Sequence, residues 1–160
     1  MTASVIILAL VTAQRLIELV IARNHTRRLL ARGAQEVGAG HYPLIVALHA
    51  AWLASLWLLA WDRSPYWPLI GLFIVLQALR LWVLATLGER WTTRIIILPG
   101  APLVTSGPFR WIRHPNYAVV VAEIAVLPLA FGLVWLAVIF TLLNAAVLAI
   151  RIKAESRALA

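Results

Sequence analysis

Long apolar stretches alternate with shorter polar ones along this chain. Crossing the roughly 30 Å hydrocarbon core of a bilayer takes about 20 helical residues. Three apolar stretches have about that length, and each predicts one membrane-spanning helix: residues 3–22, 43–61 and 67–87. The pattern therefore predicts a chain that crosses a membrane repeatedly as α-helices.

A fourth apolar stretch, at residues 116–150, is too long for a single span. Pro128 and Gly132 lie near its middle, where they favour a tight turn. We therefore expect two short helices, at residues 116–131 and 133–152, that form a tilted or partly buried helical hairpin.

The composition of the chain agrees with this pattern. Its 160 residues are 63% hydrophobic and only 12% charged. A soluble domain of this size could not bury that much apolar surface, so the bilayer must act as the solvent. We predict a single all-α domain over residues 1–160, an integral membrane bundle of about five transmembrane helices.

The net charge of +8 comes almost entirely from arginine. In a soluble protein such a balance would suggest a nucleic-acid partner. Here the arginines lie mostly between the apolar stretches, where they set topology and meet anionic lipid headgroups, so we expect membrane lipids and no nucleic acid as partners.

Residues 23–41, residues 88–115 and the tail after Ile150 are basic, whereas the turns near residues 62–66 and 132 carry no net charge. Because basic loops stay in the cytoplasm, this pattern predicts an external N-terminus, a cytoplasmic 88–115 loop and a cytoplasmic C-terminus.

The loop at residues 88–115 is long for a connection between two helices. Its prolines forbid a continuous helix, and its apolar run at residues 95–98 would be costly to leave in water. We therefore expect the loop to fold back against the membrane face or the helix bundle. Long ordered loops of this kind usually have a function.

The stretch SGPFRWIRHPNY concentrates polar and aromatic side chains at the end of this loop. Gly107 and Pro108 favour a turn that lets a ligand approach the backbone. Arg113 and His114 supply a cation and a titratable ring, and Pro115 suits the first position of the next helix, whose positive end favours an anionic group. Each arginine taken alone could merely hold a lipid headgroup, but the combined cluster favours a binding site.

Polar residues within the last two predicted helices fall on single helix faces. Asn116 and Glu123 are seven residues apart on the first of them. On the second, Asn144, Arg151 and Glu155 form one stripe. If the two helices face each other, Glu123 and Asn144 point inward beneath the cytoplasmic loop.

Other polar residues within the membrane leave two interpretations open. They either hold helices together through ion pairs and hydrogen bonds or contribute to a substrate site, and they are Arg15, Glu18, Gln77 and Arg80. His49 is expected to be a packing residue. No spacing of His, Asp and Glu predicts a metal site, and the chain has no cysteine.

The string GPFRWIRHPNY, preceded by LGERWTTRI and followed by a predicted hairpin ending in RIKAES, resembles the isoprenylcysteine carboxyl methyltransferase family. The resemblance covers residues 87–157 and rests on eight positions: Gly107, Pro108, Phe109, Arg113, His114, Pro115, Tyr117 and Glu155. Val119 and Ala154 depart from the family pattern, since many relatives have a glycine and a glutamate there. These departures count against a prenylcysteine substrate more than against methyl transfer.

The first half of the chain, especially QRLIELVIARNH and GHYPLIVALHA, looks more like a short bacterial branch of this family. That branch is associated with O-methylation of alkylpyrones and alkylresorcinol-type polyketide lipids. The resemblance therefore implies an enzyme of the bacterial inner (plasma) membrane. It implies S-adenosylmethionine as cofactor, S-adenosylhomocysteine as product, and a lipophilic methyl acceptor that arrives laterally from the membrane.

The resemblance also implies how the cofactor is held. The eight matching positions would bind it, with Arg113 and the backbone near His114 on its carboxylate and Glu155 facing its ammonium or sulfonium group. Aromatic side chains, Phe109, Trp111 or Tyr117, would pack on the adenine or the cation.

For the chemistry, the expected residues are Arg151, Glu123 and Asn144. Arg151 would position the anionic oxygen of a carboxylate, an acidic enol or a phenol. Because a carboxylate or an acidic enol is already ionised near neutral pH, no strong general base is required.

Three alternatives to O-methylation remain open. Phospholipid N-methyltransferases have a similar small helical layout. Membrane sterol reductases share a related Arg-His-x-x-Tyr-like loop and use NADPH, although their bundle is larger than this chain. The third alternative is a non-catalytic scaffold whose arginines contact lipid only. No pattern in the sequence indicates an oligomeric state.

Overall fold

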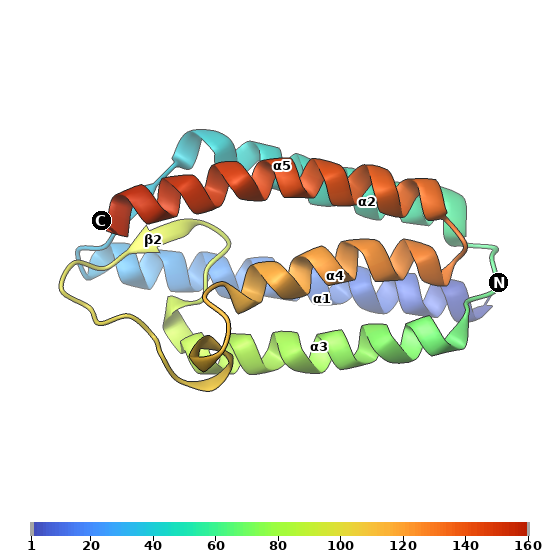
Figure 1. The fold of residues 1–160 in the computed structure, drawn as a ribbon, viewed down its shortest axis with the longest axis horizontal. Helices are drawn as coiled ribbons and strands as arrows, with labels where there is room; N and C mark the ends of the chain where they lie inside the picture. Colours follow the sequence, from blue (N-terminus) through green and yellow to red (C-terminus); the bar gives the residue numbers. More distant parts are fainter. Residues whose placement is uncertain (1, 160) are drawn as a thin grey trace.

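Five α-helices make up most of the fold (Figure 1). The computed structural model describes residues 2–159. The helices are α1 (Thr2–Ala31), α2 (Tyr42–Ala60), α3 (Trp67–Leu87), α4 (Pro115–Ala130) and α5 (Val134–Leu159). Within the described residues, four of them are long and apolar enough to cross a membrane, and α4 is a shorter apolar helix. The prediction of an all-α membrane bundle with about five helices is confirmed.

The first and last helices continue well beyond their apolar stretches. Helix α1 ends at Ala31 rather than near residue 22, and α5 ends at Leu159 rather than near residue 152. Neither extension contains a helix-breaking proline or glycine, and Gly33, with φ of 87°, follows α1 in the conformation that ends a helix. Both helices therefore project past the apolar bundle, at the end where the 88–115 loop lies (Figure 1).

The last two helices form the predicted hairpin. Pro128 lies in the last turn of α4, and Gly132 adopts a φ of 70° in the turn that follows. The turn is closed by backbone hydrogen bonds from Gly132 to Leu129 at 2.9 Å and from Leu133 to Pro128 at 2.9 Å. These bonds satisfy the last carbonyl groups of α4, so the chain reverses with little loss of hydrogen bonding.

A small sheet and three short 3-10 helices form the polar end of the molecule. Strands β1 (Gln35–Val37) and β2 (Ile95–Ile97) pair antiparallel, with Glu36 opposite Ile96. The 3-10 helices are η1 (Ala39–His41), η2 (Gly88–Arg90) and η3 (Gly107–Arg110). Ile95 is buried, so the loop folds back as its apolar run predicts.

Hydrophobic side chains fill the opposite half of the bundle. The buried cluster there joins all five helices and includes Leu8, Trp52, Phe73, Ile124 and Phe140. Many large apolar side chains point outward instead, as expected for helices surrounded by lipid.

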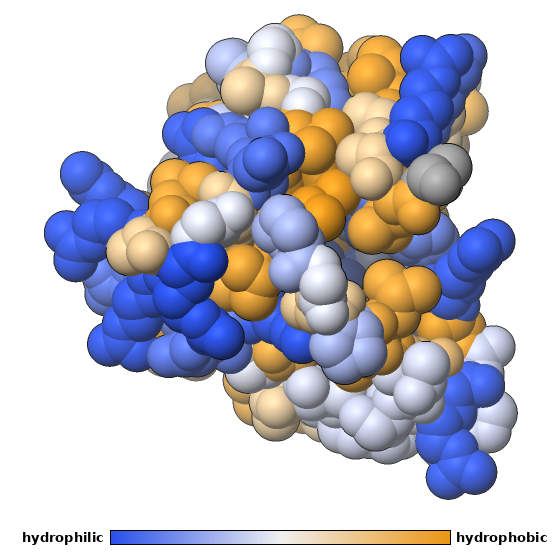
Figure 2. Space-filling view, turned by 90° about the vertical axis from the view of Figure 1, so that its left-hand side faces the viewer, coloured by the Kyte–Doolittle hydropathy of each residue, from blue (hydrophilic) through white to orange (hydrophobic). Residues whose placement is uncertain are grey.

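Hydrophilic residues gather at the end that carries the loop and the C-terminus. Figure 2 views this end directly and shows hydrophilic side chains around its rim, with hydrophobic ones between them. Glu89 pairs here with Arg28 at 3.1 Å and with Arg32 at 3.5 Å, which ties η2 to the extended end of α1. The hydrophilic side chains thus mark one polar end of a molecule whose remaining surface is largely apolar.

Candidate active site

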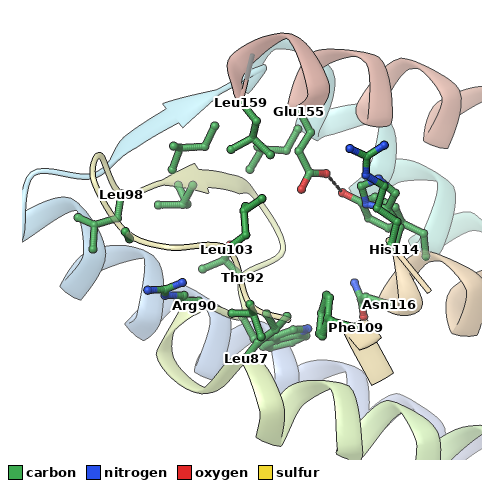
Figure 3. A pocket seen from close by; sticks show the side chains of 18 of the residues that line it. Leu87, Arg90, Thr92, Leu98, Leu103, Phe109, His114, Asn116, Glu155 and Leu159 are labelled. Carbon is green, nitrogen blue, oxygen red and sulfur yellow. Dashed lines mark hydrogen bonds between the residues drawn. The ribbon is translucent and has the colours of Figure 1, made fainter. Parts of the chain in front are cut away.

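A pocket of about 640 Å³ opens at the polar end of the bundle. Its walls come from the 88–115 loop, the start of α4 and the end of α5, and Leu29 of α1 adds to the lining. In Figure 3, Glu155 extends from α5 into this space and Phe109 lies on the opposite wall. The length of α5 beyond its apolar stretch is what brings Glu155 to the pocket.

Tyr117 links two charged side chains inside the pocket. Its hydroxyl group donates a hydrogen bond to Glu155 Oε2 at 2.7 Å and accepts one from Arg151 Nε at 2.9 Å. Arg151 is buried, and its Nη1 donates to the carbonyl oxygen of Thr93 at 2.7 Å. This chain of bonds joins α4, α5 and the loop, and it places a cation, a hydroxyl group and a carboxylate in a row.

Six of the eight residues expected to bind a cofactor line this pocket. They are Phe109, Arg113, His114, Pro115, Tyr117 and Glu155. The rings of His114 and Tyr117 stack, with centroids 5.3 Å apart. The motif thus forms one continuous wall.

The other two residues, Gly107 and Pro108, are not part of the lining. Pro108 is buried, and Gly107 has a φ of 56° and lies against α3. A Cβ atom at Gly107 would come within 2.5 Å of Thr86 Oγ1. Glycine is therefore required for close contact of η3 with α3, and the turn supports the pocket from outside.

Several loop residues in the lining were not predicted as site residues. Arg90 and Arg94 line the pocket, whereas the sequence indicated only that the loop containing them is basic. Arg90 donates a hydrogen bond to the carbonyl oxygen of Pro102. Arg94 pairs with Glu36 at 2.6 Å, and this hydrogen bond raises the pKa of Arg94 above its ordinary value. The sequence after α3 did not indicate that these two arginines line a pocket, because their place in the structure depends on how the loop folds back.

A second cavity of about 280 Å³ lies next to the first, deeper among the helices. The two share five lining residues: Trp91, Thr92, Asn116, Tyr117 and Arg151. Apolar side chains of α1, α2 and α5 make up much of the deeper wall, among them Leu16, Val46 and Leu148. Asn144 lines this deeper cavity only, and Arg151 lies where the two cavities meet.

Glu123, the third residue expected to act in the chemistry, lies outside both linings. Its side chain is fully buried and accepts hydrogen bonds from Arg15 at 2.7 Å, Gln77 at 2.8 Å and Arg80 at 3.1 Å. It points inward, as its helical phase predicts, but its carboxylate is already held by three donors. These contacts favour a role in helix packing, and a role of Glu123 in the chemistry stays a prediction.

The remaining intramembrane polar residues belong to the same network. Glu18 accepts hydrogen bonds from Arg80 at 2.6 Å and from Arg15 at 3.2 Å, so two cations face two carboxylates across α1, α3 and α4. These contacts hold the three helices together, as the structural interpretation predicts. Arg15, Glu18 and Arg80 also line the deeper cavity, as does His49, whose Nδ1 donates to the carbonyl oxygen of Ile45 at 2.9 Å.

Comparison with known proteins places this arrangement in context. The sequence model of the family described as "Isoprenylcysteine carboxyl methyltransferase (ICMT) family" matches residues 69–160, which include every predicted site residue. The chain is 37% identical to "Uncharacterized protein YpbQ" of Bacillus subtilis (strain 168), over 96% of this chain and 95% of the relative. It is 30% identical to an "Uncharacterized protein" of Haemophilus influenzae, over 94% of this chain and 91% of the relative. No solved structure matches.

Proposed function

Because this chain belongs to the isoprenylcysteine carboxyl methyltransferase family of membrane methyltransferases, we propose that it methylates an oxygen of a lipophilic acceptor, using S-adenosylmethionine. One observation carries the proposal. A pocket that several charged side chains line, at the polar end of the bundle, and a largely apolar cavity among the helices meet at Asn116, Tyr117 and Arg151. Such a junction suits a reaction between a polar cofactor and an oily acceptor.

The lining of the pocket at the polar end fits S-adenosylmethionine, because it combines charged side chains with apolar and aromatic ones. Its volume of about 640 Å³ lies within the range of roughly 300–1,000 Å³ that is usual for small-molecule sites. Arg113 suits the cofactor carboxylate, Glu155 its ammonium or sulfonium group, and Phe109 the adenine ring. When bound, the cofactor supplies an electrophilic methyl group.

Arg151 is the residue that we propose positions the acceptor oxygen. It lies at the junction, and its bond to the Thr93 carbonyl fixes one end of its guanidinium group. With the cofactor bound, the acceptor oxygen held by Arg151 would take the methyl group, and the electron pair of the carbon–sulfur bond would stay on sulfur. An acceptor that is already ionised releases no proton, so alignment and charge supply most of the catalysis.

The acceptor reaches this point from within the membrane. Leu16 and Val46, which line the deeper cavity, are also exposed on the surface of the bundle, on α1 and α2. A lipid chain between these helices would lead its polar head to Arg151. We place the polar end in the cytoplasm of a bacterial cell, where the cofactor is made, and we favour an alkylpyrone- or alkylresorcinol-type acceptor.

Binding of S-adenosylhomocysteine to the purified protein tests the cofactor site. We expect Arg113→Ala and Glu155→Gln each to weaken binding about tenfold, the usual effect of losing one charge-assisted hydrogen bond. Arg110→Ala is the matched control, because Arg110 lies in the same loop but not in the pocket lining, and it should change the affinity less than about twofold. Binding of NADPH and not of S-adenosylhomocysteine would overturn the proposal.

The methylated product tests the acceptor. Membranes containing the protein are incubated with labelled S-adenosylmethionine and a lipid extract, and the labelled lipids are separated. We expect labelled methyl esters, enol ethers or aryl methyl ethers that disappear in the Arg151→Gln variant. Labelled methylated phosphatidylethanolamine would instead identify the enzyme as an N-methyltransferase.

A further inference from the structure

Two large apolar side chains of the motif SGPFRWIRHPNY lie on the surface and outside the pocket. Trp111 is 70% exposed and Ile112 is 51% exposed, and neither lines the pocket at the polar end. Trp111 was one of three aromatic candidates for contact with the cofactor, but its place in the structure does not favour that role. Exposed apolar side chains that lie together usually mark an interaction surface.

The turn that carries these side chains lies on the lipid-facing side of α3. Exposed apolar side chains follow one face of this helix at helical spacing: Leu72, Val75, Leu79 and Trp82. Thr86 is the next position on that face, and Gly107 of η3 packs against it. The rings of Trp82 and Trp111 lie with their centroids 5.9 Å apart. The η3 turn, beside the end of α3 in Figure 1, therefore extends a surface that lipid covers.

The length of α3 gives the depth of this turn. The helix has 21 residues and is therefore about 30 Å long, which is about the thickness of the hydrocarbon core. Exposed Trp67 begins the helix, and Trp82 lies within two turns of its other end. Tryptophan is enriched at both boundaries of a membrane. The contact with Trp82 thus places Trp111 at the boundary on the polar side.

The charge next to Trp111 suits lipid phosphate. Arg110 is exposed, and its guanidinium carbon lies 5.6 Å from the centre of the Trp111 ring. Among residues 2–159 it has no carboxylate partner. Long cationic side chains at a membrane boundary keep their stems on apolar surface and their charge among the headgroups. Because the patch continues the lipid-facing surface of α3, the partner that fits it is the bilayer.

The same turn is connected to the wall of the cofactor pocket. The backbone N–H groups of Trp111 and Ile112 both donate to the carbonyl oxygen of Pro108 at 3.2 Å, so these side chains are fixed to the turn. Phe109 and Arg113, which come directly before and after this pair, line the pocket. A force that holds the outer side of the turn also holds this wall.

We propose that Trp111 and Ile112 anchor the η3 turn in the headgroup region of the bilayer at the polar end, with Arg110 on lipid phosphate. The membrane surface is then part of the cofactor site, because it keeps one pocket wall in place. The anchor itself does not depend on the proposed function, whereas its effect on cofactor binding rests on it.

A fluorescent label at position 112 tests the depth of the anchor. The chain has no cysteine, so Ile112→Cys can be labelled with an NBD group and placed in lipid nanodiscs. Lipids with a nitroxide at the top of the acyl chain should quench this label. Pro99→Cys is the control, because Pro99 is exposed in the segment that follows β2 at the tip of the loop, and its label should keep its intensity (Figure 1).

Binding of S-adenosylhomocysteine in the same nanodiscs tests the effect on the pocket. An exposed side chain in water tolerates substitution, but Trp111→Glu in the headgroup region should detach the turn and weaken binding about fivefold or more. Trp111→Tyr, which keeps an aromatic group suited to the boundary, should bind as the wild-type protein does. Trp67→Glu makes the same change at the other end of α3 and should leave the affinity of the folded protein unchanged. Ile112→Ser is a second variant if Trp111→Glu does not fold.

The outcomes separate this inference from the proposed function. An unquenched label at position 112, or wild-type affinity in both Trp111→Glu and Ile112→Ser, overturns the inference and leaves the methyltransferase proposal standing. Disulfide-linked dimers of Ile112→Cys without quenching would overturn it too, because a second copy of the chain would then cover the patch. If S-adenosylhomocysteine does not bind the wild-type protein, the proposed function fails, and quenching alone decides whether the anchor exists.

Discussion

Tyr117 is the residue on which the candidate site depends most directly. Its hydroxyl group lies 2.7 Å from Glu155 Oε2 and 2.9 Å from Arg151 Nε, and its ring stacks on His114. Because it lines both cavities, it contacts the region where cofactor and acceptor would meet. The Tyr117 hydroxyl group thus orients both Arg151, which lies where the two cavities meet, and Glu155, which lies in the larger pocket.

Replacing Tyr117 by phenylalanine separates the role of its hydroxyl group from the role of its ring. The stacking on His114 remains, while Arg151 and Glu155 each lose a hydrogen bond. We expect Tyr117→Phe to lower kcat/KM about tenfold to a hundredfold, since each bond to a charged group contributes about 1.5–3 kcal/mol. Tyr66→Phe is the control, because the Tyr66 side chain is exposed at the opposite end of the bundle. Equal activity of the two variants would show that the hydroxyl group has no part in catalysis.

At the scale of helices, the ion-pair network explains how charges are tolerated inside the membrane. Arg15 and Glu18 on α1, Arg80 on α3 and Glu123 on α4 satisfy one another at distances of 2.6–3.2 Å. Two cations and two carboxylates leave no net charge. Removing one member of a buried group of this kind leaves its partners uncompensated, which costs far more than the pair contributes.

The effect of Glu123→Gln follows from this balance. The substitution leaves Arg15 and Arg80 with Glu18 as their one anionic partner in the network, and we expect it to destabilise the fold by about 3–5 kcal/mol. The affinity of the folded fraction for S-adenosylhomocysteine should be unchanged, because Glu123 does not line the cofactor pocket. Glu155→Gln should show the opposite pattern, with normal thermal stability and weakened binding. A stable Glu123→Gln protein that binds the cofactor but is inactive would restore Glu123 to the catalytic residues.

For the whole molecule, the sequence predicted the parts that depend on local pattern. Hydropathy and the positions of Pro128 and Gly132 were enough to predict five helices and a hairpin between the last two. The pairing of β1 with β2 was not predictable, because two three-residue strands nearly sixty residues apart have no periodicity of their own. The place of Glu123 was likewise unpredictable, since helical phase gives its direction but not the partners that it meets on α1 and α3.

The deeper cavity could not be predicted from the sequence for the same reason. It is bounded by Leu16 of α1, Val46 of α2 and Leu148 of α5, which look like ordinary lipid-facing residues. Only the packing of three helices makes them a wall. The motif SGPFRWIRHPNY, by contrast, could be read from the sequence because seven of the eight expected cofactor-binding residues lie close together around a single turn and helix start.

The orientation of the whole bundle gives the last prediction. The polar end holds the candidate cofactor pocket and most of the exposed arginines, so it should face the cytoplasm. The chain has no cysteine, so a single introduced thiol is the only reactive one. Ser106→Cys lies in the exposed loop at the polar end, and Ser64→Cys lies in the exposed turn between α2 and α3.

A membrane-impermeant maleimide distinguishes the two ends. We expect Ser106→Cys to be labelled in inside-out vesicles and Ser64→Cys in right-side-out vesicles, because the two positions lie on opposite sides of the membrane. Detergent should make both thiols accessible, which controls for burial. The reverse labelling pattern would put the pocket outside the cell, away from the cytoplasmic cofactor, and would contradict both the orientation and the proposed methyl transfer.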